Sequence, residues 1–174
     1  MSSRCDGAPL RLTTEAGKEP PLPCRLDDLA DELLEGPYHI LDILPKQVPR
    51  EAGSRYFAVE RYFLQPERLR SLRRRFAELL LKLSCYEEMA VSFDNGESWE
   101  KDPDPETFAD RLAGLAGNRF LRALFPGRRV MIDLEADDTY MTCYGLEADL
   151  PELLRKLTEA ADLFLWSPEE NEKT

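Results

Sequence analysis

The stretch from residue 54 to residue 83 constrains the fold more than any other part of the chain. Residues 56–64 are rich in aromatic side chains and predict a half-buried β-strand. Gln65-Pro66-Glu67 then predicts a helix start, because proline at the first helical position loses no needed N–H and glutamate favours the positive end of the helix dipole. Apolar residues recur at three- and four-residue spacing as far as Leu83, so a long amphipathic helix is expected. A strand and a helix that each bury one side must share a core.

The remaining elements follow from similar patterns. Helices are expected at 25–34, 104–116 and 149–161, with a further helical turn at 120–125. Strands are expected at 38–44, 88–93, 98–100, 129–134, 139–144 and 163–166. Asn95-Gly96 favours a tight hairpin turn, since both residues tolerate positive φ, and Asp104 before Pro105 favours a helix N-cap.

This order of elements predicts an α+β fold. The sheet is expected to be mainly antiparallel, built from β-β-α units, with helices packed on one face. A single domain is expected over residues 24–167. Residues 1–23 lack the pattern of a secretory signal and are expected to form a mobile tail, and residues 168–174 a frayed acidic one.

The charge of the chain is strongly negative but unevenly distributed. The 174 residues carry a formal net charge of −11, with 43% hydrophobic and 33% charged residues, a composition typical of a globular protein. Residues 66–82 are basic, whereas residues 84–110 and 133–174 are strongly acidic. No apolar run is long enough for a membrane span, and the four cysteines show no paired spacing, so a cytoplasmic protein with reduced thiols is expected.

Residues suited to catalysis are few. His39 is the only histidine, which leaves no multi-histidine metal site and no evident nucleophile-histidine pair. No Rossmann or P-loop spacing is present, so no cofactor and no metal are expected. Asp42, Glu60 and Asp133 are the candidate catalytic carboxylates, because acids on neighbouring strands could converge on one face for acid–base work or cation binding. Alternatively, they lie on the solvent face or pair with nearby arginines.

Two acidic turns predict a surface for a basic partner. Their charged side chains, with one tryptophan and one tyrosine as anchors, are the candidate partner-binding residues: Asp94, Glu97, Trp99, Glu100, Asp102, Glu135, Asp137, Asp138 and Tyr140. The alternative is that the acids only form turns and that Trp99 packs in the core.

The basic helix offers a different candidate site. Arg70, Arg73 and Arg74 are neighbours on a helix and would form a patch for phosphate, RNA backbone or an acidic surface. A solvated helix face is the alternative. Nucleic acid is disfavoured because the net charge repels it and no aromatic residues interleave with the arginines.

Taken together, these features favour binding over catalysis. In size and charge the chain resembles small acidic immunity and antitoxin proteins, which implies a non-catalytic cytoplasmic module that binds a basic protein partner. Two alternatives stay open: an enzyme that uses the strand carboxylates, with or without a metal, and a phosphate or RNA contact through the arginine-rich helix.

Overall fold

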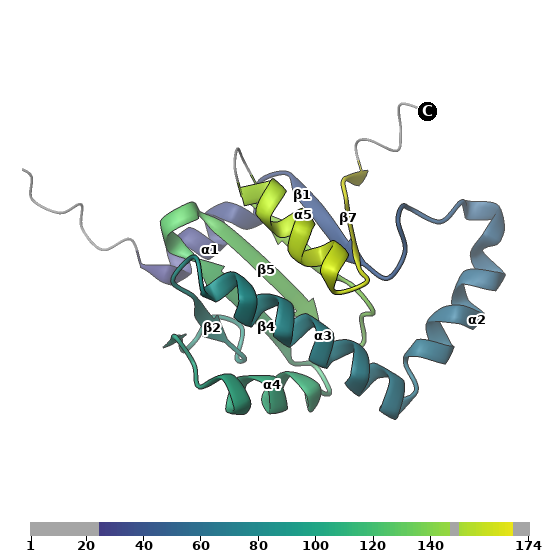
Figure 1. The fold of residues 1–174 in the computed structure, drawn as a ribbon, viewed down its shortest axis with the longest axis horizontal. Helices are drawn as coiled ribbons and strands as arrows, with labels where there is room; N and C mark the ends of the chain where they lie inside the picture. Colours follow the sequence, from purple (N-terminus) through teal and green to yellow (C-terminus); the bar gives the residue numbers. More distant parts are fainter. Residues whose placement is uncertain (1–24, 147–149, 169–174) are drawn as a thin grey trace, which may run out of the picture.

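The structure is a computed structural model that describes residues 25–146 and 150–168 (Figure 1). The predicted N-terminal tail and residues 169–174 lie outside the described residues. The helices are α1 (Leu26–Leu34), α2 (Gly53–Phe63), α3 (Pro66–Ser84), α4 (Pro105–Ala113) and α5 (Leu150–Ala160), with short 3₁₀ turns η1 (Arg50–Ala52) and η2 (Pro126–Arg128). The strands are β1 (Tyr38–Asp42), β2 (Ala90–Ser92), β3 (Glu100–Lys101), β4 (Phe120–Phe125), β5 (Val130–Glu135), β6 (Met141–Tyr144) and β7 (Phe164–Trp166).

The seven strands form one antiparallel sheet in the order β3-β2-β4-β5-β6-β1-β7. The predicted α+β class and antiparallel sheet are therefore confirmed. Strands β4, β5 and β6 are joined by consecutive antiparallel pairings, whereas β1 comes from early in the chain and inserts between β6 and β7. The N-terminal strand thus depends on residues more than a hundred positions away.

Helices α3, α4 and α5 cover one face of the sheet, as Figure 1 shows. Their fully buried side chains include Phe76, Phe108 and Leu154, which belong to one core with Leu121 and Ile132 of the sheet. The packing of α3, α4 and α5 on the sheet removes their apolar stripes from water and is the main source of stability. Among the described residues, no helix is long and apolar enough to cross a membrane.

Helix α1 packs on the opposite face and covers only part of it. Its buried residues Leu29, Ala30 and Leu33 contact Leu124 of β4 and Met131 of β5. The sheet is therefore enclosed on one side and only partly covered on the other.

The predicted strand at residues 56–64 is wrong, because this segment is helix α2. Its apolar and aromatic residues also recur at helical spacing, and a short apolar run does not distinguish the two structures. The Tyr56 hydroxyl donates to Glu60 Oε1 at 3.1 Å, a contact across one helical turn. Helix α2 has no buried residue and extends away from the sheet, so no neighbouring strand is present to pair with it (Figure 1).

The predicted helical turn at residues 120–125 is also wrong, because this segment is the interior strand β4. Leucine, alanine and arginine favour helices, which misled the interpretation. In the fold, β4 lies between β2 and β5, so its backbone bonds on both sides and its apolar residues are buried on both faces. Tertiary pairing overrides the local preference.

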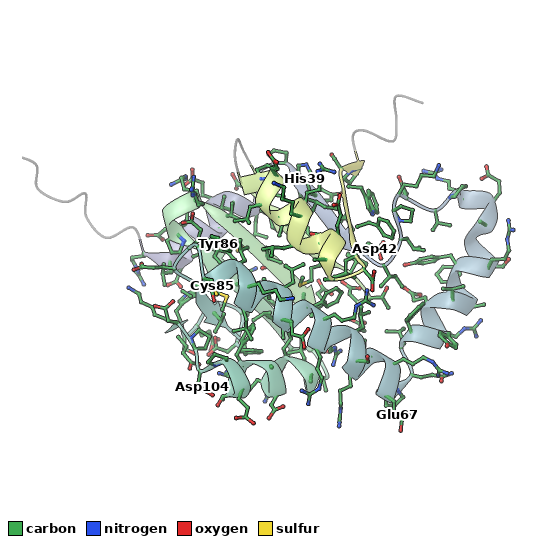
Figure 2. All side chains as sticks on the ribbon, in the orientation of Figure 1. His39, Asp42, Glu67, Cys85, Tyr86 and Asp104 are labelled. Carbon is green, nitrogen blue, oxygen red and sulfur yellow. The ribbon has the colours of Figure 1, made fainter. Side chains whose placement is uncertain are left out.

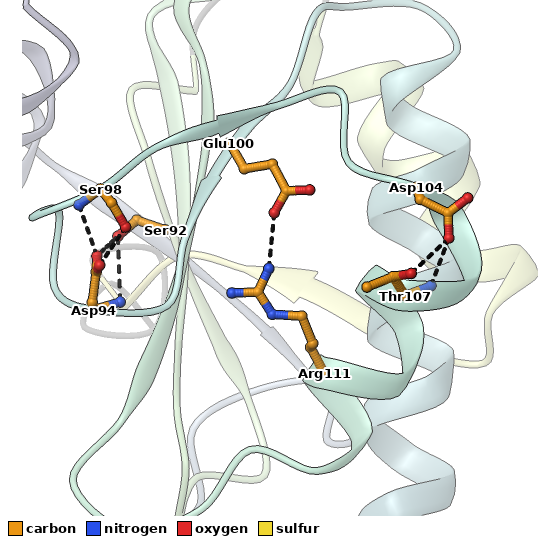
Figure 3. Close-up of polar contacts among 7 residues, drawn as sticks. All are labelled: Ser92, Asp94, Ser98, Glu100, Asp104, Thr107 and Arg111. Atoms are coloured by element: carbon orange, nitrogen blue, oxygen red, sulfur yellow. Dashed lines mark hydrogen bonds and ion pairs between the residues drawn. The ribbon is translucent and has the colours of Figure 1, made fainter.

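Two local predictions around the acidic hairpin are confirmed. Asn95 and Gly96 have φ values of 66° and 86°, as a turn with positive φ requires. The loop that joins the two strands is longer than predicted, because Val91 pairs with Glu100 and the return strand is Glu100–Lys101 instead of residues 98–100. Asp104 caps α4 by accepting hydrogen bonds from the Thr107 backbone N–H at 2.9 Å and hydroxyl at 2.8 Å (Figure 3).

Candidate functional site

The partly uncovered face of the sheet carries the most distinctive group of side chains. Asp133 pairs with Thr142, and Thr142 pairs with Ile40, so these three side chains lie on the same face. Asp42 follows Ile40 by two residues and shares that face. We call the part that α1 leaves uncovered the open face.

A cleft of about 630 Å³ lies on the open face beside the loop that follows β1. We call it the Asp42 cleft. Its lining combines residues of β1, β6 and β7 with the following loop and the start of α2: Tyr38, Ile40, Asp42, Leu44, Lys46, Gln47, Val48, Pro49, Arg50, Gly53, Tyr56, Tyr140, Thr142, Tyr144, Trp166 and Pro168. Its volume is within the range of small-molecule sites.

Asp42 is the buried charged group of this cleft. It is only 8% exposed, and none of the described lysines, arginines or histidines forms an ion pair with it. Burial raises its pKa to about 6, against which hydrogen bonds from the backbone N–H groups of Leu44 and Ile43 act more weakly. Figure 2 shows Asp42 near the end of β1, on the side from which α2 extends.

Aromatic side chains form the walls of the cleft. The rings of Tyr38 and Tyr144 lie 6.1 Å apart between centroids. The Trp166 indole donates to the Leu44 carbonyl at 3.1 Å, which fixes β7 against the loop after β1. Burial raises the pKa values of Tyr56 and Tyr140 to about 12, so both hydroxyls stay neutral near neutral pH.

Acidic groups gather at the Tyr56 and Tyr140 end of the cleft. Asp138 is half-buried, and desolvation, together with repulsion from Glu135, raises its pKa to about 6. Glu60 acts electrostatically on Asp138, and Asp42 acts on Tyr140. Several carboxyl groups therefore lie at this end of the open face, and the pKa values of two of them, Asp42 and Asp138, are raised to about 6.

A smaller hollow of about 210 Å³ adjoins the cleft and shares Tyr140, Thr142 and Tyr144 with it. Asp133 lines this hollow and receives a hydrogen bond from Arg122 Nε at 3.4 Å. Burial nevertheless raises the pKa of Asp133 to about 6, because it outweighs the Arg122 charge. Its second oxygen, Oδ1, is buried and accepts no hydrogen bond from the described residues.

The three predicted carboxylates therefore have different positions. Asp42 and Asp133 share the open face, but they line two adjoining hollows. Glu60 lies on helix α2 instead of a strand, and its carboxylate accepts the hydrogen bond from Tyr56. His39 pairs in register with buried Cys143, on the face opposite Asp42.

The predicted partner-binding residues divide between two regions. Glu135, Asp138 and Tyr140 line the smaller hollow of the open face, and Asp137 is an exposed residue of the adjoining β5–β6 turn. Those of the hairpin line a separate hollow or flank it, and several are engaged within the fold. The Asp94 carboxylate accepts from the Ser98 side chain and backbone and from Ser92, which lowers its pKa to about 2 (Figure 3).

Other hairpin residues are engaged in the same way. Glu100 pairs with Arg111 at 2.8 Å (Figure 3), and Asp102 accepts from the Met89 backbone N–H at 3.4 Å. Trp99 is half-buried against the buried residues that α1 shares with β4 and β5, and its indole donates to Asp27 at 2.5 Å. Glu97 is exposed. The hairpin carboxylates, apart from Glu97, are thus engaged in contacts within the fold: Asp94 and Asp102 within the hairpin and Glu100 with α4.

The predicted arginine patch does not form as a continuous surface. Arg73 is 4% exposed and donates to the carbonyls of Leu115 and Ala136, so it belongs to the interior. Arg70 and Arg74 are exposed, and Arg74 pairs with Asp110 at 3.3 Å. The burial of Arg73 removes the middle residue of the proposed anion site.

Sequence reasoning missed the aromatic walls of the Asp42 cleft except Tyr140, which it had named as an anchor for a partner. A signal was present, because Tyr38, Ile40 and Asp42 alternate along one strand, as do Tyr140, Thr142 and Tyr144 along another. Alternation places each set on one face. The pairing of these two strands and the approach of Tyr56 from α2 required the tertiary structure.

Comparison with family models, curated proteins and solved structures found no match to this chain. Among the described residues, no three histidine, cysteine, aspartate or glutamate side chains are grouped so that they could hold a metal ion. The chemistry of the site therefore has to be inferred from its own residues.

Proposed function

We propose that this protein is a non-catalytic interaction module that binds a basic protein partner, with the open face as its binding surface. The observation that carries the proposal is the Asp42 cleft, where a buried carboxylate without an ion-pair partner among the described residues is surrounded by aromatic side chains. Tyrosine and tryptophan are frequent anchors of interfaces, and unpaired buried charge favours an opposite charge on the partner.

The charge of the whole chain supports the same function. A formal net charge of −11 attracts a basic protein at a distance and accelerates its encounter. Exposed Tyr38 and Phe164 flank the acidic groups of the open face and supply apolar contact area. In length and net charge, the chain is comparable to small acidic immunity and antitoxin proteins.

We also propose a cytoplasmic location. Cys85 and Cys143 are free thiols, and free thiols are typical of reducing compartments. Cys143 is fully buried, which raises its pKa well above the ordinary value and keeps it unreactive.

Charge reversal on the open face tests the proposed partner. The variant Glu135→Lys/Asp137→Lys changes two exposed acids, one at the end of β5 and one in the turn that follows it, and Glu106→Lys/Glu159→Lys makes the same change in net charge on the helix-covered side. A fluorescent arginine-rich dodecapeptide serves as the probe, measured by anisotropy at about 50 mM salt, where exposed charges are weakly screened. We expect the first variant to lose affinity about tenfold or more and the second to lose far less, because only the first reverses charge at the interface.

Added salt should reduce the association rate constant of the unmodified protein steeply. If the peptide fails to bind, or if both variants weaken it equally, the open face is not the site for a basic partner.

A carboxylate enzyme is the second candidate function. The observation in its favour is that Asp42, Asp133 and Asp138 share the open face with pKa values raised to about 6, a range suited to general acid–base catalysis. Chromogenic glycosides and esters at pH 6 are suitable model substrates. Turnover by the unmodified protein that is lost in both Asp42→Asn and Asp138→Asn would support catalysis, whereas equal background rates in all three would reject it for these substrates.

A further inference from the structure

The Asp42 cleft is built around a negative charge that lacks a counter-ion among the described residues. Asp42 is 8% exposed and lies among Ile40, Leu44 and aromatic rings. Buried charges in proteins are ordinarily paired, because desolvation of an isolated ion is costly. The backbone N–H groups of Ile43 and Leu44 hydrogen-bond to the carboxylate. A carboxylate accepts about four hydrogen bonds, so acceptor capacity remains.

The walls select among possible cations. Tyr38, Tyr56, Tyr140, Tyr144 and Trp166 all line the cleft. A guanidinium group stacks on such rings through its planar face and donates two parallel hydrogen bonds to a carboxylate, whereas an ammonium group is smaller and more strongly hydrated. Planar walls beside one carboxylate therefore fit a guanidinium better than an ammonium.

The other charged groups at the cleft set the local balance. Lys46 and Arg50 lie at its rim and are exposed to water, which screens their repulsion of a cation. Glu60 from α2 and Asp138 from the β5–β6 turn act electrostatically at the opposite end. Among the described residues that line the cleft, Asp42 is thus the one acid, and further acids lie beyond the Tyr56 and Tyr140 end.

We infer that the Asp42 cleft is an arginine-binding pocket, which receives one guanidinium group from the basic protein partner, with Asp42 as its counter-ion and the tyrosine rings as its walls. This inference rests on the proposed function for the source of the arginine. It adds the residue type that the partner must present and the residue that recognises it.

A pair of isosteric probes tests the pocket directly. Nα-acetyl-L-argininamide and Nα-acetyl-L-citrullinamide have nearly the same shape, but only the first is charged. The indole N–H signals of Trp166 and Trp99 report binding by NMR, since Trp166 lines the Asp42 cleft and Trp99 lies in the separate hairpin hollow. We expect the arginine probe to shift the Trp166 signal with saturation, the citrulline probe to leave it unchanged, and Trp99 to respond to neither.

Two variants identify the counter-ion. Asp42→Asn should abolish the Trp166 response to the arginine probe, whereas Asp110→Asn, which removes the same charge from exposed α4, should retain it. Lys46→Met/Arg50→Met should bind the arginine probe more tightly, because it removes the rim repulsion. If both probes shift the Trp166 signal equally, or if Asp42→Asn responds to the arginine probe as strongly as the unmodified protein does, the cleft is not an arginine-binding pocket.

The affinity of the arginine probe should also depend on pH. Burial raises the pKa of Asp42 to about 6, while Tyr56 and Tyr140 stay neutral. Below pH 6 the affinity should therefore fall by up to about tenfold per pH unit as Asp42 is protonated, with a smaller contribution from Asp138. An affinity that is constant from pH 7.5 to pH 5 contradicts the role of Asp42.

The dodecapeptide separates the failure of this inference from that of the proposed function. Suppose that Asp42→Asn binds the peptide as well as the unmodified protein does, while Glu135→Lys/Asp137→Lys does not. The proposal of a basic protein partner is then supported, and the inference of an arginine-binding pocket at Asp42 is wrong. If the arginine probe binds at Asp42 but the peptide does not compete with it, the ligand is a free guanidino compound, and the assigned protein source is wrong.

Discussion

Arg73 and Asp42 are both buried charged residues, but their surroundings differ. Arg73 donates to the carbonyls of Leu115, after α4, and Ala136, after β5, so it joins the long helix to two distant loops. Its burial lowers its pKa, but an arginine stays charged at any ordinary pH. Asp42 has backbone partners but no ion pair among the described residues. The first residue stabilises the fold, whereas the second is the counter-ion of the pocket that we propose.

Replacement of Arg73 should therefore destabilise the protein. Arg73→Met leaves two carbonyls without their charged donor, and we expect the free energy of unfolding to fall by about 2–4 kcal/mol. Arg70→Met, on the exposed side of the same helix, should change it by less than about 0.5 kcal/mol. Urea denaturation measures both variants. Equal, small effects would show that the Arg73 contacts contribute little to stability.

At the scale of elements, α2 and α3 are consecutive helices with different roles. Helix α3 buries a continuous apolar stripe, including Leu72, Phe76 and Leu80. Helix α2 buries no residue, and Phe57 and Tyr62 are each about half exposed. It contributes Gly53 and Tyr56 to the Asp42 cleft. Helix α3 therefore holds the core together, whereas α2 mainly shapes one edge of the site.

Two phenylalanines test this difference. Phe76→Ala, at 0% exposure, should lower the free energy of unfolding by about 3–5 kcal/mol because it leaves a cavity in the core. Phe57→Ala, at 57% exposure, should lower it by less than about 0.5 kcal/mol. Chemical denaturation of the two variants provides the comparison. A large loss at Phe57 would mean that α2 packs more tightly than its exposure indicates.

At the scale of the whole molecule, the carboxyl groups form two classes. Burial raises the pKa values of Asp42, Asp133 and Asp138 from 3.8 to about 6. Hydrogen bonds to Ser98 and to Thr107 lower the pKa values of Asp94 and Asp104, respectively. The first class weakens the fold when ionised, and the second strengthens it.

The free energy of unfolding should therefore be greatest near pH 4. As pH rises from about 4 to about 6, the folded state retains protons on the raised groups that the unfolded chain has lost, so stability decreases. As pH falls below 3.8, the lowered groups are protonated in the unfolded chain first, so their contribution is lost.

Denaturation at low protein concentration from pH 3 to pH 8 measures this profile. In Asp42→Asn the free energy of unfolding should decrease less steeply above pH 4 than in the unmodified protein, whereas Asp110→Asn should leave the decrease unchanged. A maximum at or above pH 7 would contradict the raised pKa values.

Local patterns in the sequence predicted the elements that depend on near neighbours. The start of α3 at Pro66, the Asp104 cap and the positive φ of Asn95 follow from interactions within a few residues. The α+β class also follows from the order of periodic segments. Such features are specified locally, because capping and backbone geometry depend little on distant residues.

The tertiary structure alone decided the features that require distant partners. Residues 120–125 became a strand because β2 and β5 pair with them, and α2 stayed helical because no strand lies beside it. The same holds for Arg73, which sequence placed on a surface, and for the Asp42 cleft, whose walls come from β1, α2, β6 and β7. The sequence by itself determined which side chains alternate along a strand and which cap a helix. Which of these side chains come into contact depends on long-range strand pairing and on burial, and no local pattern contains that information.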